Sequence, residues 1–135
     1  MKPEEVFILD SSALLALFRG GEPGQKVELI LQKGGRHGVE LYLSAVDWGK
    51  CYSALLQQEK PRQVKEFLEK VENSALSIVA VNKKISAEAA LLAEEYRVPY
   101  EKAFAPSLGT ITDGKVVTAD PELQAVEEAV EVLWL

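Results

Sequence analysis

Two aspartates follow apolar runs near opposite ends of the chain, and hydroxyl residues accompany both. Asp10 ends the run FIL and precedes Ser11 and Ser12, while Asp120 lies two residues after Thr118 in KVVTAD. Either acid can cap a helix that follows it, because Asp is a favoured N-cap residue. Two acids brought together can instead hold a hard divalent cation, which prefers oxygen ligands. These residues alone leave both interpretations open.

The elements that must position these acids alternate between strand and helix patterns. Strands are predicted over 5–9, 40–45, 76–81, within 113–120 and over 130–135, and helices over 12–18, 21–35, 46–60, 61–74, 82–98, 99–109 and 121–129. Such alternation favours an α/β fold with a mainly parallel sheet and helices on both faces. Ligands of such sheets bind beyond the carboxyl ends of the strands, where the strand order reverses. This rule gives the two aspartates a common location, where they either form a shared acidic site or cap the helices that follow them.

Composition narrows the class of protein. The 135 residues are 47% hydrophobic and 27% charged, which suits one globular domain with a sizeable core. No apolar run approaches the roughly 20 residues that span a membrane, and the start MKPEEVFILD is too acidic for a signal peptide. A formal net charge of -6 argues against broad electrostatic binding of nucleic acid, although a local basic patch could still grip RNA.

The single cysteine and the single histidine restrict the possible chemistry further. Cys51 excludes an internal disulfide, fits a reducing cytoplasm, and lies on the apolar stripe of its predicted helix, where core packing is expected. His37 lies in KGGRHG without a Cys or His neighbour. We therefore expect neither a histidine-based metal site nor a Ser-His-Asp triad.

Five blocks spread over the chain carry a family resemblance: LDSSALLALF, LYLSAVDWGKCYSAL, YEKAFA, VVTADPEL and VEVLWL. In this order and spacing they resemble PIN-domain proteins, most closely the VapC-type toxins of prokaryotic toxin–antitoxin pairs. The resemblance implies one domain over 1–135 with a three-layer α/β/α fold and a parallel sheet of about five strands. It also implies Mg²⁺- or Mn²⁺-dependent cleavage of RNA, a homodimer, and a small antitoxin that inserts near the active cleft.

Residue by residue, the resemblance implies a degenerate acidic site. Family sites gather an Asp after the first strand, a Glu on the helix after the second, an Asp on a later helix and an Asp after the fourth strand. Asp10 and Asp120 match the first and last positions, but Lys50 of SAVDWGK and Lys102 of YEKAFA replace the other two acids. Ser11, Ser12 and Thr118 stand where the family places supporting hydroxyls.

The two lysines change the charge of the implied site. Four carboxylates carry -4, whereas two aspartates and two lysines sum to zero before any metal arrives. At a separation of about 4 Å and an effective dielectric constant of about 20, each charge pair is worth roughly 4 kcal/mol. The lysines would repel a divalent ion and could pair with the aspartates instead. We therefore predict impaired catalysis, with either no cofactor or weakly bound Mg²⁺ or Mn²⁺.

Helical projection gives the lysines a plainer interpretation. Lys50 and Lys102 both lie opposite the apolar stripes of their predicted helices, so only the resemblance directs them into a cleft. Pro106 also predicts a short or kinked helix near Lys102, because proline removes a hydrogen bond and crowds a preceding carbonyl.

Two functional hypotheses remain. In the first, an inactive PIN-like protein binds a protein partner or RNA. In the second, an active Mg²⁺/Mn²⁺-dependent endoribonuclease uses a substitute acid: Glu101, Glu122 or, best placed, Asp47, one helical turn before Lys50.

Overall fold

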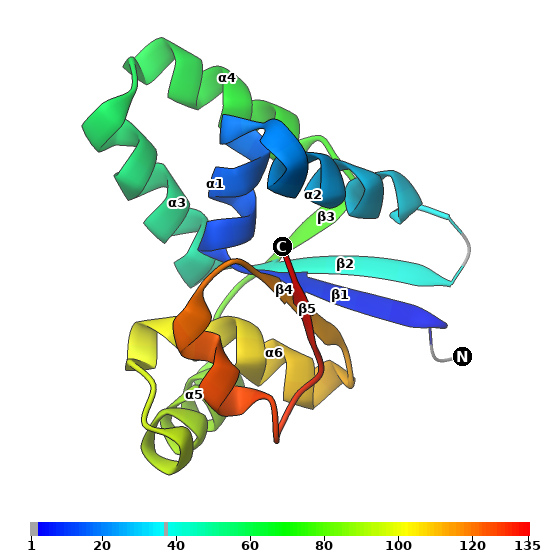
Figure 1. Cartoon of the computed structure of the whole chain (residues 1–135), viewed down its shortest axis with the longest axis vertical. Coiled ribbons are helices and arrows are strands. Elements are labelled where there is room, and N and C mark those ends of the chain that lie inside the picture. Colours follow the sequence, from blue (N-terminus) through cyan, green and yellow to red (C-terminus); the bar gives the residue numbers. More distant parts are fainter. Residues whose placement is uncertain (1–2, 37) are drawn as a thin grey trace.

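A five-stranded, wholly parallel sheet lies between two layers of helices in the computed structural model, which describes residues 3–36 and 38–135 (Figure 1). The elements, with η for short 3₁₀ helices, are β1 (Glu5–Leu9), α1 (Ser11–Arg19), α2 (Gly21–Lys33), β2 (Val39–Ser44), α3 (Ala45–Gln58), α4 (Pro61–Glu72), β3 (Leu76–Val79), α5 (Lys83–Tyr96), η1 (Tyr100–Lys102), α6 (Phe104–Thr112), β4 (Lys115–Thr118), η2 (Pro121–Val126) and β5 (Val132–Trp134). The predicted α/β/α architecture is confirmed.

Strand β1 is apolar throughout because both of its faces are buried. Phe7 and Leu9 belong to the core beneath α1–α4, while Val6 and Ile8 point the other way, into the core beneath α5, α6 and η2. This alternation follows from the two-residue period of a strand. Figure 1 shows the two helical layers on opposite sides of the sheet.

The sheet order β3-β2-β1-β4-β5 places the reversal of strand order between β1 and β4. Leu9 at the end of β1 pairs with Leu43 of β2 on one side and with Val117 of β4 on the other. The chain therefore leaves the three central strands at one edge of the sheet, where Asp10 and Asp120 follow β1 and β4. Within the described residues, no helix has the length and apolar character to cross a bilayer.

Two predicted helices differ from the structure. The segment 99–109 is η1 followed by α6, with a break at Ala103. Pro106 lies in the first turn of α6, where backbone N–H groups have no partner within the helix, so it removes no hydrogen bond there. The helix is short, at nine residues, as the proline predicted. The segment 121–129 forms the 3₁₀ helix η2 over Pro121–Val126 rather than an α-helix. Both short elements lie beside the acids.

Candidate functional site

Asp10 is buried at the start of α1 and accepts three hydrogen bonds. Its Oδ1 accepts from the Ala13 amide (2.9 Å) and the Ser12 hydroxyl (2.6 Å), and its Oδ2 accepts from the Thr118 hydroxyl (2.5 Å). Burial raises its pKa more than these hydrogen bonds lower it, and the Asp120 charge raises it further. Asp10 thus caps α1, and it also belongs to a group of three aspartates, Asp10, Asp47 and Asp120, called the acid cluster below.

Hydroxyl groups join the loop after β1 to the loop after β4. Thr118 Oγ1, which donates to Asp10, accepts from the Asp120 amide at 2.9 Å. Ser12 Oγ likewise accepts from the Ala119 amide at 2.9 Å. These bonds fix the two loops to each other, so the backbone positions of both strand-end aspartates are determined together.

Asp47 is a second buried acid, only 2% exposed, in the first turn of α3. Its Oδ1 accepts from the Ser11 amide at 3.0 Å, and its Oδ2 accepts from the Ser44 hydroxyl at 2.7 Å. Burial raises its pKa to about 6; the Asp10 charge acts in the same direction, against the hydrogen bonds from Ser44 and Ser11 and the Lys50 charge. Asp47 therefore belongs to the same cluster and ties α3 to the start of α1.

Ser44 is the site residue that sequence reasoning missed. It caps α3, accepts from the Asp47 amide at 3.0 Å, and is fully buried. The signal was present, because SAVD fits the pattern of Ser or Thr followed three residues later by an acid, which marks a helix start.

Lys102 forms the ion pairs of the cluster. Its Nζ lies 2.8 Å from Asp120 Oδ2 and 2.9 Å from Glu122 Oε1, and its side chain is 25% exposed. The hydrogen bonds to Asp120 and Glu122 raise the pKa of Lys102 to about 12. Burial alone would raise the pKa of Asp120, but the hydrogen bonds from Lys102 and the Glu122 amide, with the lysine charges, lower it overall. The solvent-facing position that projection gave Lys102 is wrong, because residue 102 belongs to η1 and not to the helix that follows.

Lys50 reaches a different acceptor. Its Nζ donates to the backbone carbonyl of Glu101 at 3.0 Å, which links α3 to η1. Its charge also lowers the pKa of both Asp47 and Asp120, so it acts electrostatically on the cluster. The structure thus brings together Asp10, Asp47 and Asp120 with both lysines around the ends of β1, β2 and β4.

The described side chains do not fit a bound divalent ion. Both carboxylate oxygens of Asp10, Asp47 and Asp120 already accept hydrogen bonds from the chain, one of them from the Lys102 ammonium. Within residues 3–36 and 38–135, no three Asp, Glu, Cys or His side chains are grouped to hold a metal ion. Mg²⁺ requires near-octahedral oxygen ligands, and an ammonium within the cluster opposes this arrangement.

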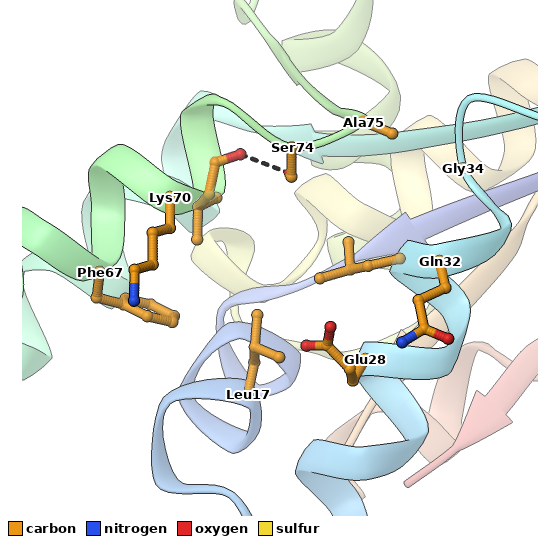
Figure 2. Close-up of a pocket in the computed structure, with 10 residues that line it drawn as sticks. Leu17, Glu28, Gln32, Gly34, Phe67, Lys70, Ser74 and Ala75 are labelled. Carbon is orange, nitrogen blue, oxygen red and sulfur yellow. Dashed lines mark hydrogen bonds between the residues drawn. The ribbon is translucent and has the colours of Figure 1, made fainter.

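A groove of about 610 Å³ opens between α1, α2 and α4, apart from the acid cluster (Figure 2). Figure 2 shows Leu17 of α1, Glu28 and Gln32 of α2, and Phe67 and Lys70 of α4 around it. Apolar side chains thus form part of its wall, and Glu28 and Lys70 add charges of both signs to the lining. A groove with a partly apolar lining suits a protein segment that carries apolar side chains.

Another residue considered from the sequence, Cys51, lies outside the cluster. Cys51 is buried in the core beneath α1–α4, and burial raises the pKa of its thiol to about 12. Such a thiol is protonated near neutral pH and is a poor nucleophile. His37 lies outside the residues that the structure describes.

Residues 7–129 match the PIN domain family. The chain belongs to this family, which confirms the resemblance seen in its sequence blocks.

Solved structures show the same fold at low identity. The chain is similar to VapBC2 from Rickettsia felis bound to a DNA fragment from its promoter (TM-score 0.75, 11% identity, 96% of this chain and 98% of that one). It is also similar to DNA-bound VapBC from Salmonella typhimurium (TM-score 0.73, 12% identity, 96% of this chain and 97% of that one). A third similar structure is Mycobacterium tuberculosis VapC20, a sarcin-ricin loop cleaving toxin (TM-score 0.69, 12% identity, 89% of this chain and 94% of that one). Comparison with curated protein sequences gave no match.

Proposed function

We propose that this PIN-domain protein acts by binding a protein partner of the antitoxin kind, and that RNA cleavage by the family's metal-dependent route is impaired. The observation that carries the second part is the Lys102 ammonium, 2.8 Å from Asp120. A cation fixed there neutralises one of the two aspartates, Asp10 and Asp120, that stand at the family's acid positions. Lys50 and Lys102 offset two of the four negative charges of Asp10, Asp47, Asp120 and Glu122, which weakens the attraction of the site for a divalent ion.

The binding part of the proposal rests on the groove between α1, α2 and α4. Similar folds have been solved as VapBC assemblies, which supports a partner of the same kind for this chain. Leu17, Leu31 and Phe67 line the groove, so the bound segment should bring apolar side chains to them. Burial of apolar surface would supply most of the binding free energy.

Paired substitutions on one helix test the groove. Leu31 lines it, whereas Leu29, two residues away on α2, is 61% exposed and outside it. The tagged chain is used to isolate a small partner, which is then purified and titrated calorimetrically. We expect Leu31→Glu to weaken binding at least roughly tenfold and Leu29→Glu to leave it unchanged. Equal affinities for both variants would exclude the groove, and a chain with no partner would refute the binding role.

One observation favours the second candidate function, an active ribonuclease with an altered site. Asp47 lies close enough to Asp10 for their charges to interact, so a substitute acid is present in the cluster. RNA cleavage in Mn²⁺ that is abolished by both Asp10→Ala and Asp47→Asn would support this candidate. We propose the inactive form because the described acids do not group as a metal site.

A further inference from the structure

The two lysines at the acid cluster have unequal environments. The Lys102 ammonium contacts two carboxylates, at 2.8 Å from Asp120 and 2.9 Å from Glu122. Lys50 donates to a backbone carbonyl, and in the part of the chain that the structure describes no ion pair joins it to a carboxylate. One lysine is therefore bound as a cation between acids, while the other acts as a link between α3 and η1.

The backbone of η1 fixes Lys102 in this position. The Lys102 amide donates to the Pro99 carbonyl at 2.9 Å, and the next amide, of Ala103, donates to the Tyr100 carbonyl at 2.9 Å. Ala103 is fully buried where the chain turns into α6. The backbone of Lys102 is thus held in place by a hydrogen-bonded turn next to the core.

Of the two acids that receive the ammonium, Asp120 is fixed as well. Asp120 Oδ1 accepts from the Glu122 amide at 3.0 Å, and the Asp120 amide donates to Thr118 Oγ1 at 2.9 Å. Only Glu122, whose side chain is 54% exposed, is free to adjust around a cation. One fixed and one adjustable carboxylate therefore meet at the point that the ammonium occupies.

We propose that Lys102 is an internal cation that keeps the acid cluster closed to divalent ions, and that Lys50, whose ammonium binds a backbone carbonyl, contributes much less to this exclusion. The inference deepens the proposed function, on which it rests, by assigning the loss of the metal site to one residue. Removal of the Lys102 charge leaves two carboxylates facing the same point, with Asp10 nearby. The variant should therefore bind a divalent cation that the native chain does not bind.

Mn²⁺ titration followed by the electron paramagnetic resonance of the free ion tests this directly. We expect Lys102→Met, whose uncharged side chain is one atom shorter, to bind one Mn²⁺ at least roughly tenfold more tightly than the native chain. Lys50→Met, which removes a charge that contacts only a backbone carbonyl, should gain much less. Lys115→Met is the matched control, because Lys115 lies within 3.8 Å and 4.0 Å of two other acids, Glu5 and Glu131. Paramagnetic broadening should be strongest at amides near Asp120 and Glu122.

Several outcomes would overturn the inference: tight Mn²⁺ binding by the native chain, an equal gain in Lys50→Met or Lys115→Met, or no gain in folded Lys102→Met. If Lys102→Met is unfolded, refolding by Mn²⁺ but not by NaCl of equal ionic strength supports the inference. Failure to refold, together with a folded Lys102→Gln that binds no Mn²⁺, refutes it. A Lys102→Met without Mn²⁺ binding, beside a native chain that binds its partner and cleaves no RNA, would leave the proposed function intact.

Discussion

Replacement of Asp47 by asparagine changes the pH dependence of stability in a direction fixed by its burial. Both oxygens of this carboxylate are enclosed, with donors from Ser11 at 3.0 Å and Ser44 at 2.7 Å. Burial raises the pKa from its ordinary value of 3.8 to about 6. Between these two values the folded chain holds the proton more tightly than the unfolded chain. The free energy of unfolding therefore falls as the pH rises through this window.

The size of the effect follows from the pKa shift. A shift of about two units at 1.36 kcal/mol each corresponds to a cost of about 3 kcal/mol, present in full above pH 7 and absent only below about pH 3. Asparagine has no charge to bury, so Asp47→Asn avoids this cost at pH 8. Loss of the hydrogen bond from Ser44 costs the variant about 1 kcal/mol at every pH. The difference in unfolding free energy, variant minus native, should rise by about 2–3 kcal/mol between pH 4 and pH 8.

Urea unfolding followed by tryptophan fluorescence at pH 4, 6 and 8 measures this difference. Asp113→Asn serves as the control, because Asp113 is exposed at the end of α6 in a left-handed conformation that asparagine also adopts. The control should shift stability equally at all three pH values. If the Asp47→Asn difference is also the same at pH 4 and pH 8, the carboxylate is not destabilised by burial and the reasoning fails.

Three further predictions concern single contacts. Thr118→Val should cost about 1–3 kcal/mol of unfolding free energy in urea, because Asp10 Oδ2 loses its donor, and Thr118→Ser should restore most of it; equal loss in both would indicate packing rather than the hydroxyl. Lys50→Met should speed amide hydrogen exchange in η1 more than Lys50→Arg does, since the hydrogen bond from Lys50 to the Glu101 carbonyl is lost; identical rates would show that this hydrogen bond does not stabilise η1. Gly24→Ala should lower the thermal midpoint, because a Cβ would lie 2.6 Å from the Ala16 carbonyl oxygen in the α1–α2 contact; an unchanged midpoint would show that the helices separate freely.

The sequence predicted the positions of the strand-end acids for a physical reason. Buried parallel strands are uniformly apolar, so the first acid after each run marks the carboxyl end of the strand. β1 and β4 are neighbours in the sheet, and Asp10 and Asp120 therefore follow at the same edge. Nothing beyond strand assignment and the rule for parallel sheets was needed.

The environments of the lysines could not be predicted in the same way. Helical projection assumed one helix through 99–109, but the chain breaks at Ala103 and the 3₁₀ turn before it has a different period. The acceptor of Lys50 is a backbone carbonyl, which has no residue-type signal. Glu122 meets Lys102 only because η2 is short and tight. Such contacts depend on local backbone geometry, which residue patterns do not specify.

RNA cleavage by the Lys50→Glu, Lys102→Asp double variant, measured beside the native chain in Mg²⁺ and in Mn²⁺, tests whether the two lysines block the metal-dependent chemistry. We expect no metal-dependent cleavage by the native chain and cleavage by the double variant, abolished by a further Asp10→Ala substitution. Metal-dependent cleavage by the native chain, lost in Asp10→Ala, would show instead that the cluster of Asp10, Asp47 and Asp120 works with both lysines in place.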